Sequence, residues 1–146
     1  MSLERYLKAQ APVYAQALAE LKRGHKQSHW MWYVFPQIAG LGHSSMSYTY
    51  AIQSLEEARD YLAHPVLGAR MRECCETLMA VEGRTAHEIF HSPDDLKFRS
   101  SLTLFARAAP DEPLFDDLLM KYFGGEEDSA TLELLAAGAT RKQKPD

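Results

Sequence analysis

The chain has 146 residues, a length typical of one domain and sufficient to bury a single hydrophobic core. Hydrophobic residues make up 46% and charged residues 25%, which argues against a disordered chain and is typical of a globular protein. The formal net charge of −4 argues against a general nucleic-acid binder, because such proteins need a basic surface to replace phosphate counterions.

Residues that start and stop helices divide the first half of the chain. Pro12 predicts a helix start and Gly24 the end of that helix, because proline favours the first turn and glycine the position after the last. Ser54 and Glu57 have the spacing of a capping box and predict a second helix over 55–63. A third helix begins at Pro65, and its apolar residues recur at helical spacing: Leu67, Met71, Cys74 and Leu78.

The second half of the chain carries the same kinds of signal. Thr85 and Glu88 form another capping box, and Ser92 is the predicted N-cap of a helix with Pro93 in its first turn. Pro113 and Asp128 predict the starts of the last two helices. No period-two strand pattern is found. We therefore predict an all-α protein, a single compact domain of six to seven short helices over residues 1–138, followed by a polar tail over 139–146.

Several negative observations bear on localisation and cofactors. No apolar stretch approaches the length of a membrane span, and we expect no secretory signal. Cys74 and Cys75 are adjacent, so a disulfide between them would be strained, and we expect free thiols in a reducing compartment. The glycines of 40–42 lack phosphate-loop and dinucleotide patterns. We expect a cytoplasmic protein with no cofactor and no membrane or nucleic-acid partner.

Residues 28–50 differ from the helical pattern around them. This segment holds both tryptophans, with tyrosine, serine, histidine and glycine and little charge, and 36–47 is predicted to be a loop. One interpretation is a pocket wall, in which Trp30 or Trp32 stacks on a flat ligand while Gln37 and Ser44 hold its polar edges. The other interpretation is structural: the aromatic rings fill the helical core and the loop is a strap.

A second polar cluster lies at the predicted helix start over 94–101. Lys97 and Ser101 could bind a ligand there, with Lys97 meeting an anion near the helix amides. The structural alternative is that the acids cap the helix dipole and the serines allow close helix packing. We predict that this cluster faces segment 28–50 across a cleft, and that His29 or Asp95 is the candidate catalytic proton carrier.

The sequence resembles the bacterial family catalogued as domain of unknown function 1810, over about residues 6–135. The resemblance implies a mainly helical fold and supplies no activity. It rests on the following runs: SHWMWYVFPQ, GLG, YAI, EEARDYL with HP, LG and R, and DDLKFRSSLTLF.

His87, Glu88 and His91 match the H-E-x-x-H zinc motif letter for letter. Pro93 follows two residues after the motif, so His91 would lie at the frayed end of a very short helix. The extended motif also fails, because Lys97 stands where a third histidine is needed. The family resemblance implies glycine at the position of His91. We therefore disfavour a metal site here.

Three functions from different classes follow. The first is a small-molecule pocket, binding or hydrolytic, between segment 28–50 and the helix start at 94–101, with a nucleotide-type ligand as one candidate. The second is a protein-interaction module without chemistry, which predicts an exposed apolar patch instead of a pocket. The third, disfavoured, is a zinc hydrolase at the HEIFH segment.

Overall fold

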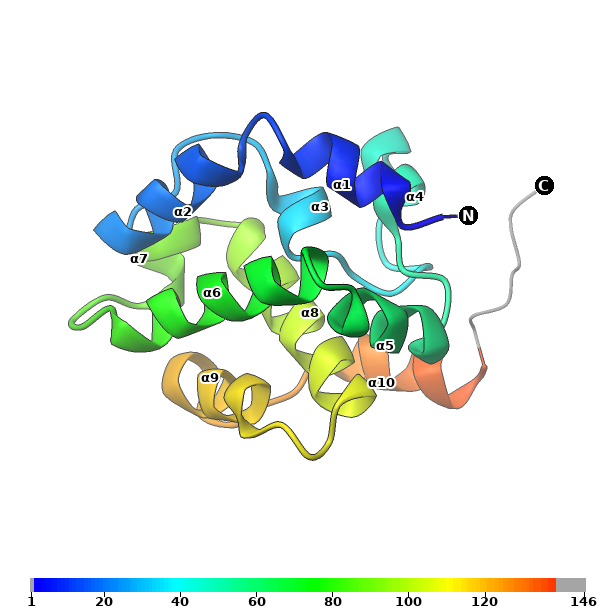
Figure 1. Ribbon diagram of the computed structural model, residues 1–146. Helices are drawn as coiled ribbons and strands as arrows, with labels where there is room; N and C mark the ends of the chain where they lie inside the picture. Colours follow the sequence, from blue (N-terminus) through cyan, green and yellow to red (C-terminus); the bar gives the residue numbers. More distant parts are fainter. Residues whose placement is uncertain (1, 139–146) are drawn as a thin grey trace.

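The computed structural model describes residues 2–138, which form ten helices joined by short turns (Figure 1). The predicted tail over 139–146 lies outside the described residues. The helices are α1 (Glu4–Gln10), α2 (Tyr14–Arg23), α3 (Met31–Val34), α4 (Ser45–Tyr50), α5 (Leu55–Ala63), α6 (Leu67–Ala80), α7 (Ala86–Phe90), α8 (Asp94–Ala108), α9 (Pro113–Phe123) and α10 (Ser129–Ala136).

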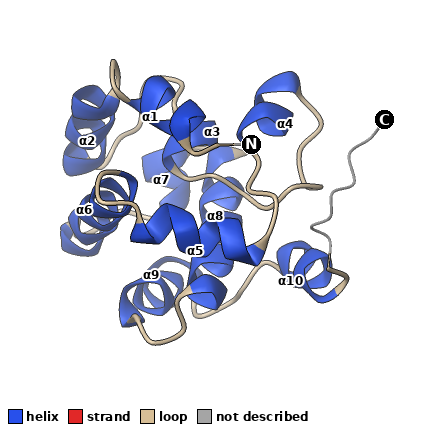
Figure 2. Ribbon diagram, turned by 45° about the vertical axis from the view of Figure 1, so that its right-hand side comes forward, coloured by secondary structure: helices blue, strands red, loops and turns tan. Residues whose placement is uncertain are grey.

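The all-α class is confirmed for the described residues, whereas the expected number of six to seven helices is too low. Figure 2 shows helices and loops throughout this part of the chain. The additional helices include α1, whose N-cap Leu3 makes no side-chain hydrogen bond. Another is α4, which begins inside the predicted loop and is capped by the Ser44 hydroxyl, which accepts a hydrogen bond from the Ser47 N–H. Both helices are short and lack a proline start, and α1 also lacks a side-chain cap.

The observed helix starts lie close to the predicted ones, and the capping hydrogen bonds show where they differ. Ser54 accepts a 3.0 Å hydrogen bond from the Glu57 N–H, while Glu57 accepts from the Gln53 N–H instead of the Ser54 N–H. The capping box of α7 is complete, with Thr85 and Glu88 bonding reciprocally. The expected Ser92 cap is wrong, because α8 starts after Pro93 and has no side-chain cap hydrogen bond.

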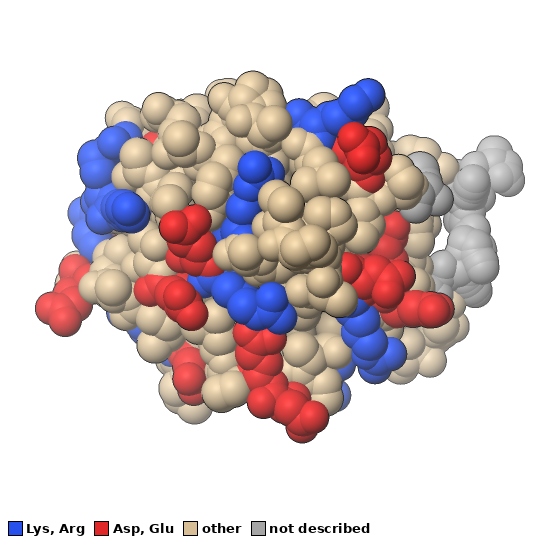
Figure 3. All heavy atoms as spheres, viewed as in Figure 1, with Lys and Arg blue, Asp and Glu red and all other residues tan. Residues whose placement is uncertain are grey.

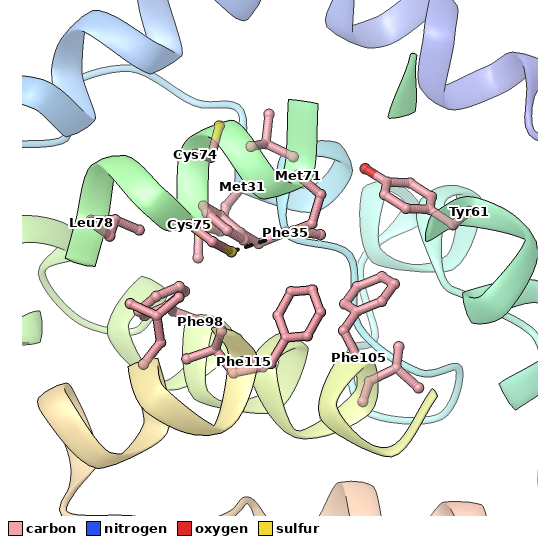
Figure 4. Packing of buried hydrophobic residues seen from close by; sticks show 14 of the residues in the cluster. Met31, Phe35, Tyr61, Met71, Cys74, Cys75, Leu78, Phe98, Phe105 and Phe115 are labelled. Carbon is pink, nitrogen blue, oxygen red and sulfur yellow. Dashed lines mark hydrogen bonds between the residues drawn. The ribbon is translucent and has the colours of Figure 1, made fainter. Parts of the chain in front are cut away.

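Helix α8 lies at the centre of the core, where it packs against α5 and α9 (Figure 1). On α8 the side chains of Phe98, Leu102 and Phe105 are buried, with exposed fractions of 0–1%. Figure 4 shows Phe98 and Phe105 below α6, on the side toward which Cys75 points, whereas Cys74 points to the opposite side of α6. Both cysteines are free and buried, and burial raises the pKa of the Cys74 thiol to about 12.

The loop between α3 and α4 is anchored to the core by a short parallel bridge between Ile38 and Ile52. The Ala39 N–H donates to the Ile52 carbonyl at 2.8 Å, and the Ile52 N–H donates to the Gln37 carbonyl at the same distance. Ile38 and Ile52 are both buried. The loop is therefore a packed part of the structure, and α3 is held in place at its C-terminal side.

The surface carries no dominant charge of one sign on the face shown in Figure 3, where lysine and arginine are interspersed with aspartate and glutamate. Among the helices of residues 2–138, none is long and apolar enough to cross a membrane.

Candidate functional site

A pocket of about 380 Å³ opens between the residues that lead into α3 and the segment that joins α7 to α8. Small-molecule sites typically have volumes of roughly 300–1,000 Å³. Met31 and Phe90 form an apolar part of the pocket wall. Each is about 2% exposed, so this part of the wall is continuous with the hydrophobic core. The lining also includes polar and charged side chains: Lys26, Gln27, His29, His91, Asp94 and Lys97.

An aromatic ring and a lysine meet in this pocket. The Lys97 ammonium lies 5.4 Å from the centroid of the Trp32 ring, within the range of a cation–π attraction. Trp32 is partly buried on α3, and the Lys97 side chain at the start of α8 is 25% exposed. The two segments that the sequence singled out therefore face each other here. Their binding of a ligand stays a prediction.

A buried ion pair forms another part of the wall. The Lys26 Nζ lies 2.8 Å from the Asp94 Oδ2 and donates a 2.6 Å hydrogen bond to the Ser28 carbonyl. The Lys26 side chain is 7% exposed, and its ammonium lies 5.0 Å from the Trp30 ring centroid. The Asp94 Oδ1 lies 3.8 Å from the Lys97 Nζ, so one carboxylate is shared by two ammonium groups. This arrangement supplies the counter-charge that a buried lysine requires.

The segment that leads into α3 is positioned by Glu20 of α2, which is fully buried. Its Oε1 accepts hydrogen bonds from the Gln27 and Ser28 N–H groups at 2.9 and 3.1 Å and from the Trp30 Nε1 at 2.8 Å. Its Oε2 accepts from the Ser28 hydroxyl at 2.6 Å and from the Gln16 side chain at 2.8 Å. Burial alone would raise the pKa of Glu20, but these hydrogen bonds to the ionised form outweigh it and lower the pKa to about 2.

The same segment is tied to α7 by the Lys26 N–H, which donates to the Ile89 carbonyl at 2.7 Å. In Figure 1 the loop from α2 to α3 passes beside α7. Neither Glu20 nor Lys26 was singled out from the sequence. Both are ordinary charged residues in polar surroundings, and only the fold buries them. The one available signal was Glu20 itself, an acid that interrupts the apolar stretch of α2.

The backbone N–H groups of residues 95–97, in the first turn of α8, are occupied within the protein. The Asp95 N–H donates to the His91 carbonyl at 2.9 Å, and the Leu96 and Lys97 N–H groups donate to the Pro93 carbonyl at 3.0 and 3.1 Å. The Asp95 side chain also accepts from the Leu96 N–H. The expectation that helix amides would help Lys97 hold an anion is therefore wrong for residues 95–97.

His91 adopts a backbone conformation that favours glycine. Its φ of 63° and ψ of 171° lie in a region that side chains rarely enter. The residue turns the chain from α7 toward α8, and its ring lies 5.3 Å from that of His25, centroid to centroid. This backbone conformation explains why the family resemblance implies glycine at position 91.

Of the predicted site residues, His29, Trp32 and Lys97 line the pocket, and the structure places Trp30 and Gln37 elsewhere. Trp30 is 1% exposed and packs in the core, so it offers no face to a ligand. Gln37 belongs to the loop between α3 and α4, where its carbonyl accepts the hydrogen bond from the Ile52 N–H.

The remaining predicted residues also lie outside the pocket lining. Ser44 is exposed and caps α4. Ser101 is buried within α8, and its hydroxyl has no hydrogen-bond partner among the described residues. The Asp95 Oδ2 lies 3.3 Å from the Nδ1 of His87, outside the pocket lining. Among the candidate proton carriers, His29 alone lines the pocket.

The zinc motif does not form one helical face. His87 lies within α7, whereas His91 lies beyond its end with positive φ, and the two rings are 6.4 Å apart, centroid to centroid. Glu88 completes the capping box instead of facing a metal. Within residues 2–138 no group of three or more potential ligands is arranged to hold a metal ion.

Comparison with known proteins shows the family to which this chain belongs. The family model described as protein of unknown function DUF1810 matches residues 1–135. The chain belongs to the DUF1810 family. This DUF1810 protein is also similar to a solved structure, that of the conserved hypothetical protein Rv1873 from Mycobacterium tuberculosis. The two share 53% identity with a TM-score of 0.90, over 92% of this chain and 96% of that chain. No curated protein matches the chain significantly.

Proposed function

We propose that this DUF1810 protein binds a small molecule with a flat ring in the pocket between segment 28–50 and the start of α8. The observation that carries the proposal is the convergence of Trp32 and Lys97 on one pocket, 5.4 Å apart. An aromatic ligand could stack on the indole while the lysine meets a polar group at its edge. A nucleotide-type molecule is one candidate for the ligand.

The rigidity of the pocket supports this proposal. Glu20 fixes the backbone of Gln27 and Ser28, and Asp94 fixes Lys26 against the start of α8. Because these groups are already ordered, a ligand loses less free energy in organising its site. His29 is the candidate proton carrier for any reaction on the bound molecule, since its side chain lines the pocket.

Thermal-shift measurement with a panel of ring-bearing metabolites tests the proposal. The panel contains nucleobases, nucleosides, nucleotides and aromatic acids. A binding member at 100 times its Kd stabilises the fold by about 2.7 kcal/mol, which is a readily measured shift in Tm. Trp32→Ala removes this shift, because it removes the stacking surface. Tyr48→Ala is the matched control: Tyr48 is 51% exposed and lies outside the pocket lining.

Two outcomes would contradict the proposal. One is the absence of any stabilising compound across the panel, and the other is equal stabilisation of the wild type and Trp32→Ala. The absence of any stabilising compound would favour the interaction-module hypothesis, whereas equal stabilisation would show that the compound binds without stacking on Trp32. The exposed large apolar side chains of the described residues come from four separate segments and would be the first candidates for such a contact: Tyr48, Val66, Leu96 and Met120.

A further inference from the structure

We infer that the pocket selects a flat aromatic molecule with a single negative charge, as a carboxylate or a phosphodiester. This inference rests on the proposed function and names its ligand class. It draws on the charge, the spacing and the backbone hydrogen bonding of the residues around Lys97.

The charges of the lining side chains do not cancel. With neutral imidazoles, the lining side chains carry the positive charges of Lys26 and Lys97 and the negative charge of Asp94, which leaves a formal charge of +1 on the lining itself. The ionised Glu20 is not one of the lining residues, and its Oε1 already accepts three hydrogen bonds from the segment over 27–30. In a partly enclosed pocket such a surplus is less screened than on the surface. A ligand with one negative charge balances it.

The position of this surplus charge is Lys97. Asp94 is closer to Lys26, at 2.8 Å, than to Lys97, at 3.8 Å. Lys26 is nearly buried and also bonded to the Ser28 carbonyl, whereas Lys97 is 25% exposed. A ligand anion can therefore replace Asp94 as the partner of Lys97 without separating the buried Lys26–Asp94 pair. The Trp32 ring, 5.4 Å from the same ammonium, places the aromatic part of the ligand beside its charge.

The backbone sets an upper limit on the ligand charge. Sites for polyphosphates commonly use several free N–H groups in addition to a lysine. Here the N–H groups of residues 95–97 donate to the His91 and Pro93 carbonyls and are not available. Lys97 thus acts as a single point charge, which suits one carboxylate or phosphodiester better than a chain of phosphates.

Titration calorimetry of the full chain with matched pairs of probes tests the inference. The first pair is 2-naphthoate with neutral 2-naphthamide, and the second is adenosine 3′,5′-cyclic monophosphate with neutral adenosine. We expect at least one anion to bind about tenfold more tightly than its neutral twin, as for one charge-assisted hydrogen bond. Naphthoate alone would assign the carboxylate, and the cyclic nucleotide alone the phosphodiester. ATP is expected to bind more weakly than the cyclic nucleotide.

Variants of Lys97 identify the group that gives this preference. Lys97→Met removes the charge and keeps the length of the side chain, so the anion and its twin bind equally. Lys97→Arg keeps the preference and shows that the fold tolerates substitution at this position. Lys8→Met, at an exposed lysine of α1, is the matched control and leaves the preference unchanged.

The contrary outcomes separate this inference from the proposed function. If the neutral twins bind as tightly as the anions and Trp32→Ala abolishes both, the pocket binds rings but the charge selection is wrong. Tighter binding of ATP than of the cyclic monophosphate would overturn the single-charge limit. If none of these probes and no member of the wider panel binds, both proposals fail.

Discussion

Replacement of Glu20 by glutamine tests whether this carboxylate organises the wall of the pocket. Glutamine has nearly the same shape, so the variant creates no cavity. Its side-chain oxygen can still accept from the Gln27 and Ser28 N–H groups and from the Trp30 indole. The variant loses the negative charge that strengthens these hydrogen bonds. Its amide nitrogen also replaces Oε2 and cannot accept from the Ser28 hydroxyl or the Gln16 side chain.

The pKa of Glu20 sets the size of the effect. The hydrogen bonds lower this pKa from 4.5 to about 2. A pKa difference of this size corresponds to roughly 3 kcal/mol of stabilisation, at about 1.4 kcal/mol per unit. Because the pKa is lower in the folded state, the stabilisation is fully present above pH 4.5 and is lost as the pH falls toward 2. We therefore expect Glu20→Gln to cost about 2–3 kcal/mol at pH 7 and much less near pH 2.

Urea unfolding of the wild type and Glu20→Gln at several pH values between 7 and 2 measures this difference. Glu76→Gln is the control, since Glu76 is exposed on α6, and its cost should stay within about 0.5 kcal/mol at pH 7. A cost below about 0.5 kcal/mol for Glu20→Gln at pH 7 would refute the reasoning. A cost that does not change with pH would show that the hydrogen-bond geometry matters and the charge does not.

Two further predictions concern the fold. His91→Gly is expected to stabilise the protein by about 1 kcal/mol, because relief of the positive-φ strain exceeds the added entropy of the unfolded chain. The control His87→Gly, inside α7, should instead destabilise the protein by about 1 kcal/mol. Chemical denaturation that ranks the two variants the other way would contradict the positive φ at residue 91. Leu102→Ala should lower the free energy of unfolding by roughly 2–5 kcal/mol in the same assay, because Leu102 is 1% exposed. Leu96→Ala, at a side chain that is 50% exposed, should lower it far less. Similar losses at both positions would mean that α8 presents a different face to the core.

The helices that could be predicted are those with local start and stop signals. Pro113 begins α9, and the Thr85 capping box begins α7, because both signals depend only on neighbouring backbone groups. The helix starts predicted at Pro12 and Pro65 are two residues too early, since each proline lies in a turn before α2 or α6 begins. The short helix α1 was missed because it has no side-chain cap, and α4 because its one local signal, the Ser44 cap, lies in a segment whose composition predicted a loop.

The candidate site could be predicted in part from unusual composition. Trp32 and Lys97 stood out because a helical stripe did not account for them, and they meet in the pocket. Trp30 could not be told apart from Trp32 by composition. Trp30 precedes α3 as its N-cap residue and is 1% exposed, whereas Trp32 lies within α3 and is only partly buried. Lys26 was missed because only the fold brings it to Asp94, far along the chain.

The placement of Asp94 and Lys97 on α8 also affects how the pocket moves. These residues begin the same helix whose later turns carry Phe98 and Phe105 at the centre of the core. Segments of this kind open to hydrogen exchange only when the whole molecule unfolds. We therefore expect the pocket wall on α8 to be formed before a ligand binds. A ligand should associate in a single step, with a rate constant that depends linearly on its concentration and shows no preceding conformational phase.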